Sequence, residues 1–499
     1  MAGVPAAMDD ISPLRVRRVN DAPLNTSGRH VVYWMVTQRR LGWNFALERA
    51  VGHARSLGLP LIILEALRCQ YPWSSRRHHA FALDGMREHA ARLMESDAAY
   101  HPYVEPTPGA GKGLLEALAR DAAVVVTDEY PTYFVPGMVA AAGRRLAVSL
   151  EAVDSNGLLP MAATPGPHTA AYHFRRFLQK TLPPHLLELP HPDPLAAAPL
   201  VRGEVPAGVL AKWPPASQAL LANRREALDA IPFLHDVPPS DIPGGEEAAR
   251  RRLRDFLQRD LHRYGEERNH PDDGAASGLS PYLHWGHLSA HEVFREVAKS
   301  EGWSPARLSS RTDGKRHGWW GMSPAAESFL DELVTWRELG YSFCHHVPDH
   351  HRYDALPEWA LGTLADHEDD PRAWCYALED FDQARTHDPL WNAAQRELRH
   401  RGVIHNYLRM LWGKKILEWS RTPREALAIM VELNNRYALD GRDPNSYSGI
   451  FWVLGRFDRG WPERPVYGKV RSMSSDNTRK KVRVDRYLDT WGPQPGLDL

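Results

Sequence analysis

Short β-rich runs alternate with amphipathic segments between residues 29 and 160. The predicted strands are 30–35 (HVVYWM), 59–67 (LPLIILEAL), 122–129 and 146–153, and the predicted helices are 43–57, 78–95, 112–120 and 134–145. Strands that alternate with helices form parallel sheets covered on both faces, because each parallel connection has to return along the sheet. Such sheets bind ligands at the carboxyl ends of their strands. This segment therefore predicts an N-terminal Rossmann-like parallel α/β domain.

The chain changes character twice after this domain. Residues 161–245 are rich in proline, which lacks a backbone donor and breaks helices, so we predict a long linker with short helices such as 170–182. From 246 to 490 apolar residues recur at helical spacing, which predicts an all-helical second domain. Its first helix carries an apolar stripe that Gly265 is predicted to end: Leu253, Phe256, Leu257, Leu261 and Tyr264.

Length and composition support two domains. The 499 residues are too many for one ordinary core, and residues 1–28 and 491–499 are predicted to be a flexible leader and a tail. Three scattered cysteines are too few for a disulfide framework, which favours a reducing, cytoplasmic compartment. The chain contains no apolar run of about 18 residues, so no membrane span is expected.

Charge is distributed unevenly, although the net charge is only −1. Eight Lys and Arg residues lie between Arg464 and Arg486, against Asp476 and Asp485. A local basic patch can bind a phosphate backbone even in a near-neutral protein, because counterion release depends on local contacts. The patch therefore predicts nucleic-acid binding, with a solvated tail as the alternative.

Three other segments have plausible functional and plain structural interpretations. GAGKG at 109–113 lacks the third glycine of a dinucleotide loop and the Ser or Thr of a P-loop, so we predict a turn before a helix. HHVPDHHRY at 345–353 is rich in histidine, but Pro348 interrupts it, and we predict a loop without a metal. Residues 303–322 form a long connection that either packs through its tryptophans or contacts DNA.

Tryptophan concentrates in the stretch 391–461, which holds five of the 17 in the chain. Trp412 and Trp419 are seven residues apart and thus share one helical face, with Arg409 on the same stripe. An aromatic core explains this spacing as well as a functional site does. The segment LNNRYALDGRDPN (433–445) adds amides and carboxylates around a turn. Polar groups beside an aromatic core favour a flat heterocycle with a polar edge.

The order of these segments resembles the photolyase/cryptochrome family, and within it the class II cyclobutane pyrimidine dimer (CPD) photolyases. The resemblance spans most of the C-terminal half of the chain. The matching segments are SGLSPYLHWGHLS (277–289), ESFLDELVTWREL (327–339), THDPLWNAAQRE (386–397), YLRMLWGKKILEW (407–419), LNNRYALDGRDPN (433–445) and WPERPVYGKVRSMS (461–474).

The resemblance implies a non-covalently bound FAD in the helical domain, active as the fully reduced anion. Asn434 matches the residue that faces flavin N5, and an amide can present either its carbonyl or its NH2 there. Arg409 and Asp440 would pair beside the ring, next to Gly441. The residues that would grip the diphosphate are Tyr264, Ser277, Gly278, Leu279 and Ser280, in keeping with a helix N-terminus. An antenna chromophore of deazaflavin or folate type in the N-terminal domain is left open.

The resemblance also assigns the catalytic and DNA-binding residues. Trp412, Trp391 and Trp419 match an electron-transfer triad that would run in that order from the flavin to solvent. Glu332 would act as a hydrogen-bond donor to the carbonyls of the dimer. The residues that would hold the lesion and its DNA are Trp336, Trp452, Arg459, Trp461, Lys469 and Arg471. The loop between Trp452 and Trp461 is one residue shorter than expected, and Phe457 replaces a familiar histidine.

The implied activity is that of a deoxyribodipyrimidine photo-lyase, which repairs cyclobutane pyrimidine dimers by electron transfer to a flipped-out dimer. Base flipping is implied by the resemblance to the family alone. The expected partner is UV-damaged DNA, bound by a monomer without an obligate protein partner, in the cytoplasm and at the nucleoid. The main alternative is a cryptochrome-like receptor that binds FAD without repair. Repair of (6-4) photoproducts is less favoured because no histidine pair occupies the matching positions.

Overall fold

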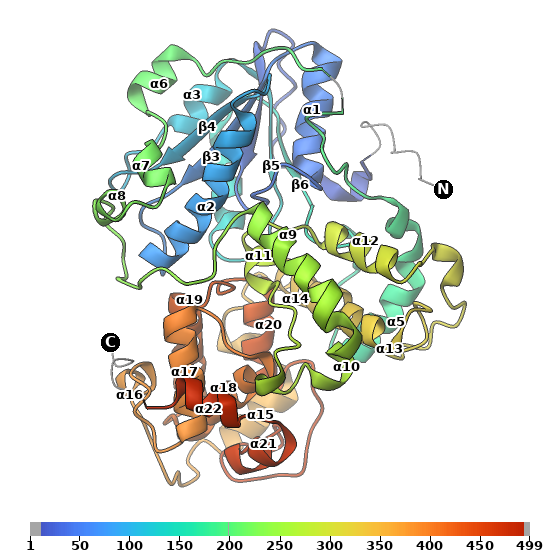
Figure 1. Ribbon diagram of the computed structural model, residues 1–499, viewed down its shortest axis with the longest axis vertical. Coiled ribbons are helices and arrows are strands. Elements are labelled where there is room, and N and C mark those ends of the chain that lie inside the picture. The colour runs from blue at the N-terminus through green and yellow to red at the C-terminus, as the bar shows by residue number, and fades with distance from the viewer. Residues whose placement is uncertain (1–10, 198, 494–499) are drawn as a thin grey trace. The chain divides into compact units, whose positions relative to one another are not determined.

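The computed structural model describes residues 11–197 and 199–493 (Figure 1). The chain divides into two compact units that interleave along the sequence. The first unit comprises the described parts of Met1–Pro165, Thr181–Arg251 and Leu279–Glu296, and the second comprises Gly166–Lys180, Arg252–Gly278 and the described part of Val297–Leu499. The proline-rich segment predicted as a linker is thus divided between the two units by its packing.

Within the described residues, the first unit contains a six-stranded sheet of order β1-β6-β5-β2-β3-β4. Its strands are β1 (Val16–Arg18), β2 (His30–Met35), β3 (Leu61–Leu67), β4 (Ala99–Val104), β5 (Ala122–Asp128) and β6 (Leu150–Val153). Strands β2 to β6 pair in parallel, and β1 pairs antiparallel with β6. The parallel α/β prediction is confirmed. Strand β4 was not predicted, because its AYHPYV sequence contains a histidine and a proline in place of an apolar run.

Residues 11–28 differ from the predicted flexible leader. Val16–Arg18 pairs with β6, and the buried Arg15 guanidinium donates to the carbonyl oxygens of Asp154, Gly157 and Leu158 at 3.2, 3.1 and 2.8 Å. A short strand without an apolar pattern is ordered here because its neighbour supplies the hydrogen bonds. Residues 1–10 of the predicted leader and 494–499 of the predicted tail lie outside the described residues.

In the described part of the first unit, the first four helices alternate with the strands as predicted, and four more lie outside this alternation. They are α1 (Phe45–Leu57), α2 (Arg76–Leu93), α3 (Leu114–Ala119), α4 (Val135–Arg145), α6 (Ala207–Lys212), α7 (Gln218–Leu221), α8 (Arg225–Asp229) and α11 (Ser280–His284). Helix α1 begins where the Asn44 side chain accepts from the amides of Ala46 and Leu47, and it ends at Gly58 in the left-handed conformation. GAGKG precedes α3 as a turn, as predicted.

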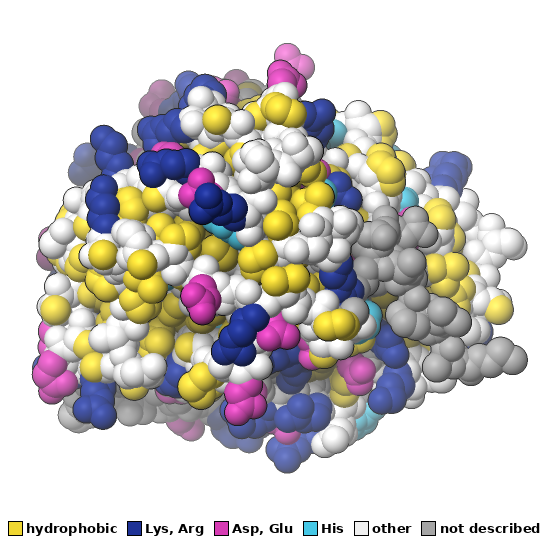
Figure 2. Space-filling model, turned by 90° about the horizontal axis from the view of Figure 1, so that it is seen from above, with side chains coloured by type: hydrophobic (Ala, Val, Ile, Leu, Met, Phe, Trp, Pro, Cys, Tyr) yellow, Lys and Arg dark blue, Asp and Glu magenta, His cyan; other side chains and the backbone are white. Residues whose placement is uncertain are grey.

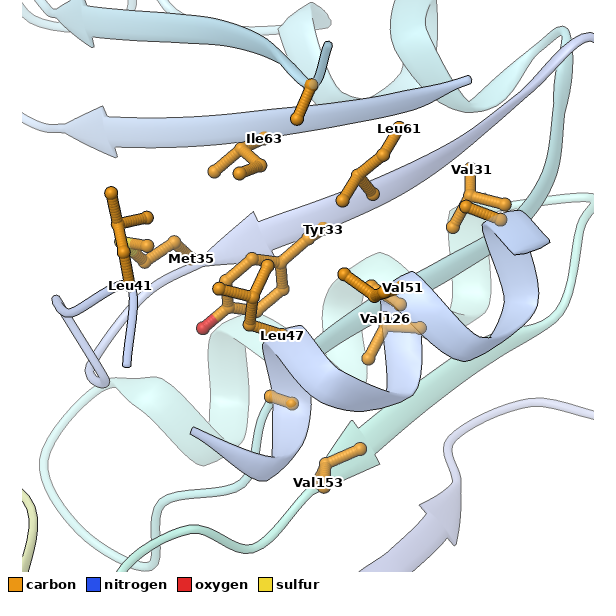
Figure 3. Packing of buried hydrophobic residues seen from close by; sticks show 14 of the residues in the cluster. Val31, Tyr33, Met35, Leu41, Leu47, Val51, Leu61, Ile63, Val126 and Val153 are labelled. Atoms are coloured by element: carbon orange, nitrogen blue, oxygen red, sulfur yellow. The ribbon is translucent and has the colours of Figure 1, made fainter. Parts of the chain in front are cut away.

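The core of the first unit lies between α1 and the sheet. Figure 3 shows Val31, Tyr33 and Met35 of β2 packing with residues of α1 and the adjacent strands, and all belong to one buried cluster. Such burial contributes roughly 25 cal/mol per Å² of apolar surface. The sheet therefore provides a rigid support for the loops at its carboxyl edge.

The second unit is helical. Its helices are α5 (Ala171–Thr181), α10 (Tyr264–Glu267), α13 (Pro324–Leu330), α14 (Arg337–His346), α15 (Glu358–Asp366), α16 (Leu378–Asp382), α17 (Pro389–Arg401), α18 (Asn406–Trp419), α19 (Pro423–Tyr437), α20 (Pro444–Val453), α21 (Ser475–Lys481) and α22 (Asp485–Trp491), while α9 (Glu246–Asp255) and α12 (Ala290–Ser300) run from the first unit into it. None of the described residues of this unit belongs to a strand. The all-helical prediction is confirmed.

The helical path around Gly265 differs from the prediction. After α9 the chain continues through a π-helical turn (Phe256–Asp260), a 3-10 turn (Leu261–Arg263) and α10, which contains Gly265. Phe256 and Tyr264 both pack against Phe329, at centroid distances of 4.7 and 5.4 Å. This packing holds the turns in place, because one glycine weakens a helix by only about 1 kcal/mol.

Surface charges are mixed on the face shown in Figure 2, where Lys and Arg side chains are interspersed with Asp and Glu. In the described part of the chain, no helix is both long and apolar enough to cross a membrane. Residues 303–322 pack through their tryptophans: Trp303 Nε1 donates to the Trp320 carbonyl at 2.6 Å, and Trp319 and Trp320 are buried. The packing alternative for this segment is supported.

Candidate functional site

The three predicted relay tryptophans come together in the core of the second unit. Trp391 Nε1 donates to the carbonyl oxygen of Trp412 at 3.0 Å, and the rings of Trp391 and Trp419 are 6.1 Å apart. Trp412 Nε1 donates to Gln395 Oε1 at 2.9 Å. All three indoles are buried. Helix packing therefore connects residues that are up to 28 positions apart in sequence.

Local sequence fixes the helices that carry these indoles. The Asp388 carboxylate accepts from the amides of Leu390 and Trp391 at 2.9 and 3.1 Å, and Pro389 takes the first helical position of α17. Proline costs nothing there, because that N–H has no partner within a helix. The Asp388 cap thus fixes where α17 begins, and with it the position of the buried Trp391.

Arg409 and Asp440 form the predicted ion pair. Arg409 Nη2 lies 3.0 and 3.2 Å from the two carboxylate oxygens of Asp440. The Ser446 hydroxyl donates to the Asp440 carbonyl at 2.7 Å, which holds the turn before α20. A Cβ at Gly441 would lie 2.8 Å from the Asn434 carbonyl oxygen, so only glycine fits there. The turn therefore brings Asp440 and Asn434 near each other.

Asn434 is buried, and the nitrogen of its side-chain amide forms a hydrogen bond. Its Nδ2 donates to Asn435 Oδ1 at 3.2 Å, and Asn435 Oδ1 also accepts from the Arg442 amide at 2.9 Å. Among the described residues, no hydrogen bond reaches Asn434 Oδ1. Polar atoms of a residue as buried as Asn434 normally have a partner, so this oxygen is available to an N–H of a ligand.

The predicted diphosphate segment crosses from the second unit into the first between Gly278 and Leu279. In the second unit, Arg252 Nε donates to the Ser277 carbonyl at 2.7 Å, and Gly278 adopts the left-handed conformation. In the first unit, α11 begins at Ser280, and Leu279 offers no side-chain cap. The predicted helix start is confirmed, and an anion there would be stabilised by the helix N-terminus.

Glu332 lies in a π-helical turn (Asp331–Trp336), a feature that is frequent at functional sites. Its carboxylate forms an ion pair with Arg268 Nη1 at 2.5 Å, and its side chain is 29% exposed. Arg268 also lies over the Tyr264 ring and donates to its hydroxyl at 3.5 Å. In this structure Glu332 is the ion-pair partner of Arg268, and its role as a hydrogen-bond donor to the dimer stays a prediction. Trp336 is half-buried at the end of the same turn.

Burial, together with the negative charge of Glu332, raises the pKa of Tyr264 to about 12. The same carboxylate raises the pKa of Arg268, against the effect of burial. Tyr264 is therefore a neutral donor and Arg268 a permanent cation. Sequence reasoning missed Arg268, although its position four residues after Tyr264 on a helix was a usable signal.

Four of the predicted DNA-binding residues form one aromatic and basic group: Trp452, Trp461, Arg459 and Arg471. The Arg471 guanidinium carbon lies 4.2 Å from the Trp461 ring centroid and 5.5 Å from that of Trp452. Arg459 is exposed, with its guanidinium carbon 5.4 Å from the Trp461 ring centroid. Guanidinium planes over indoles are worth about 0.5–1 kcal/mol at exposed sites. Lys469 is exposed, and its carbonyl accepts from the Trp461 amide at 2.8 Å.

Two further residues of this group were not predicted. Asp458 pairs with Arg471 Nε at 3.1 Å and accepts from Trp461 Nε1 at 3.3 Å, which orients both side chains. Lys414 is fully buried, with its ammonium nitrogen 4.9 Å from the Trp452 ring centroid and 2.5 Å from the Val453 carbonyl oxygen. Burial lowers the pKa of Lys414 to about 7. Only the tertiary fold could reveal that this lysine points inward.

The carboxyl edge of the sheet is filled by the chain itself at the point where strand order reverses, between β5 and β2. The Asp128 carboxylate accepts from the amides of Val36, Thr37 and Gln38 at 2.8, 2.7 and 3.0 Å, and from the Tyr33 hydroxyl at 2.8 Å. Consecutive backbone amides of this kind form an anion-binding cradle. An anionic ligand group would have to displace Asp128 to use it. Among the described residues, no group of three or more His, Cys, Asp or Glu could hold a metal ion.

A solved structure shares the fold of this chain. A class III photolyase from Agrobacterium tumefaciens superposes with a TM-score of 0.65 over 93% of this chain and 86% of that chain, at 19% sequence identity. The fold is therefore that of the photolyases. No protein-family model matches the sequence.

Relatives with known names identify the family. The chain is 34% identical over 480 residues to the deoxyribodipyrimidine photo-lyase of Methanothermobacter thermautotrophicus. The aligned residues make up 95% of this chain and 97% of the relative. It is 37% identical over 478 residues to the enzyme of the same name from Oryza sativa. That alignment covers 92% of this chain and 87% of the relative. The chain belongs to the deoxyribodipyrimidine photo-lyase family.

Proposed function

We propose that this protein is a class II CPD photolyase, which uses light and FAD to repair cyclobutane pyrimidine dimers in DNA. The observation that carries the proposal is the end-to-end similarity to a deoxyribodipyrimidine photo-lyase, over 95% of this chain and 97% of the relative. The side chains of the second unit are consistent with it, because they combine a buried indole relay with an aromatic, basic surface group.

The residues around Asn434 fit FAD. Its Oδ1, without a partner among the described residues, would accept from a ring N–H, and the Arg409–Asp440 pair would hold charge beside the ring. The resemblance to the photolyase family assigns the diphosphate to Ser277, Gly278, Leu279 and Ser280. Bound FAD in its reduced anionic state supplies the light-excited electron donor, and the protein supplies binding, orientation and electrostatics.

The indoles of Trp412, Trp391 and Trp419 would serve activation of the cofactor and not the repair step. Indoles are readily oxidised, and short electron hops are supported by the ring contact of Trp391 with Trp419 and by the hydrogen bond from Trp391 to the Trp412 carbonyl. Trp412→Phe should therefore abolish photoreduction while sparing repair by chemically reduced protein.

The lesion would contact the aromatic and basic group. Trp452 and Trp461 offer ring faces, which stabilise stacked bases by about 1–3 kcal/mol each, and Arg459 and Arg471 offer charge to phosphates. A dimer is poorly stacked and paired, so extruding it costs less than extruding normal bases. Glu332 would meet the dimer as an acceptor while it is paired with Arg268, and donation by Glu332 would require that pair to open.

A cryptochrome-like receptor is the alternative function. It would need the cofactor residues but not the aromatic and basic group, whose Trp461 and Arg471 are oriented by Asp458. That orientation supports DNA binding. We further propose a monomer without an obligate protein partner, acting in the cytoplasm and at the nucleoid on UV-damaged DNA. A deazaflavin or folate antenna, if bound, would have to use a site other than the cradle that Asp128 fills.

The test uses the FAD-loaded protein after reduction with dithionite. An oligonucleotide with one thymine dimer is illuminated with blue light, and dimers are counted against a dark sample and against an oligonucleotide with a (6-4) photoproduct. We expect light-dependent loss of the dimer alone. A protein that retains FAD and binds the oligonucleotide, yet leaves the dimer intact in light, would establish the receptor alternative.

A further inference from the structure

The predicted relay does not reach solvent at its third tryptophan. Trp419 is only 3% exposed, whereas Trp374 of the same unit is 50% exposed. We propose that Trp374 is a fourth redox-active tryptophan, coupled to Trp419 through the ring of His387, and that it is the solvent end of the relay. This inference rests on the proposed function of the first three tryptophans.

Ring contacts join the buried indoles to the surface without a gap. Trp391 and Trp419 are 6.1 Å apart, Trp419 and His387 are 4.9 Å apart, and His387 and Trp374 are 4.4 Å apart. The last two rings are nearly parallel, with an interplanar angle of 17°. The imidazole therefore fills the space between the two indoles with a conjugated ring, which couples them better than aliphatic side chains or water would.

Hydrogen bonds fix the imidazole in this stack. The Tyr376 hydroxyl and His387 Nδ1 share a hydrogen bond at 2.8 Å, and the His387 amide donates to the Tyr376 oxygen at 3.0 Å. The Tyr376 amide donates to the Trp419 carbonyl at 3.0 Å, which ties residues 374–376 to the end of α18. His387 immediately precedes Asp388, the cap of α17. Both ends of the stack are therefore attached to the helices that carry the relay.

Electrostatics favours movement of an electron hole from Trp419 to Trp374. A cation on a buried indole loses its hydration, whereas a cation on a half-exposed indole keeps part of it. The Lys415 ammonium also lies 5.3 Å from the Trp419 ring centroid and repels a positive charge there, with partial compensation from Glu418 at 2.6 Å from that ammonium. The hole is therefore more stable at the surface than in the core.

The electron balance is simple. The Trp419 radical cation takes one electron from the Trp374 indole and returns to its neutral state. The Trp374 radical cation releases its N–H proton to water. A thiol in the solvent then donates one electron and one proton to the neutral Trp374 radical, so the thiol is the species that is finally oxidised. His387 and Tyr376 keep their protons and oxidation states throughout.

The first experiment maps the oxidised residue by mass spectrometry. FAD-loaded protein is illuminated with blue light in air without a thiol, digested, and searched for oxidised tryptophan. We expect oxidation at Trp374 that falls about tenfold in Trp419→Phe. Trp491, which stacks on His400 at 6.3 Å as a comparable histidine–tryptophan pair, reports damage by reactive oxygen and should be oxidised equally in both proteins.

The second experiment measures the lifetime of the indole radical by transient absorption. Trp374→Phe changes an exposed side chain, and we expect it to shorten the radical lifetime about tenfold and to slow the re-reduction by added thiol. Trp491→Phe is the control and should behave as the wild type. An unchanged lifetime in Trp374→Phe, or oxidation that maps to Tyr376, would overturn the proposal.

These outcomes are distinct from a failure of the proposed function. Trp374→Phe reduced with dithionite should repair dimers at the wild-type rate. Absence of repair in every protein, the wild type included, would contradict the proposed function. Equal photoreduction of Trp412→Phe and the wild type would instead contradict the relay on which Trp374 depends.

Discussion

Replacing Lys414 with methionine should stabilise the protein at neutral pH. Its ammonium is fully buried, and its neighbours are the Val453 carbonyl, the Trp452 ring and the charges of Asp458 and Arg471. Because burial lowers the pKa from 10.5 to about 7, the folded state gives up about 5 kcal/mol of protonation free energy at pH 7. Methionine matches the length of the lysine stem and loses a hydrogen bond worth about 1 kcal/mol. We expect a net gain of roughly 4 kcal/mol at pH 7.

The pH dependence fixes the sign of this effect. Below pH 7 lysine is protonated in both states, and the cost of burying the charge is felt in full. Between pH 7 and 10.5 the unfolded chain binds more protons than the folded protein, so the stability of the wild type rises with pH. The advantage of Lys414→Met should therefore shrink through this range and become a deficit of about 1 kcal/mol near its upper end.

Urea unfolding between pH 6 and pH 10.5, followed by tryptophan fluorescence, measures the difference. This signal includes the second unit, which holds Trp391, Trp412 and Trp419, together with tryptophans of the first unit such as Trp34 and Trp43. Lys415→Met is the matched control, because the Lys415 ammonium has an ion-pair partner, Glu418, at 2.6 Å. Its stability difference from the wild type should not follow the same pH curve. A Lys414→Met difference that is constant over this range would refute the reasoning, whatever its size.

Three other substitutions test separate parts of the fold and site. Asp440→Asn should weaken FAD binding by roughly tenfold to a hundredfold, because Arg409 loses a charge-assisted partner at 3.0 Å, and equal flavin retention on gel filtration would contradict the assignment. Arg175→Met should cost at most about 3–5 kcal/mol in urea unfolding, since it removes the guanidinium at 2.6 Å from the buried Asp331 and leaves that carboxylate with the Arg316 guanidinium at 3.7 Å. Gly286→Ala should lower the melting temperature, because its φ of +73° disfavours a side chain and its Cβ would overlap a backbone carbonyl oxygen. A Gly286→Ala protein that melts with the wild type would contradict that geometry.

Periodic patterns predicted the elements well where local and tertiary preferences agree. The strands β2, β3, β5 and β6 and the helices between them were evident, because buried parallel strands are continuous apolar runs. Strand β4 and the short strand β1 were missed, because their order depends on hydrogen bonds from neighbours and not on their own composition. The continuation of the helical path through Gly265 was missed for the same reason, since packing on Phe329 overrides a weak local preference.

The candidate site shows the same division. The resemblance to the photolyase family implied a pair between Arg409 and Asp440, and the structure pairs them as expected. The spacing of residues in one segment does not predict contacts with residues of other segments. The ion pair of Glu332 with Arg268 and the inward position of Lys414 are of this kind.

By itself the sequence determined a parallel α/β region, a helical region and a set of tryptophans, amides and charges in family order, because periodicity and motif order are properties of the chain. Only the tertiary structure decided which side chains are charged partners, which indole is buried and which is exposed. Those properties depend on distance and solvent access between residues remote in sequence. The separation of 45 positions between Trp374 and Trp419, bridged in space by one imidazole ring, illustrates why.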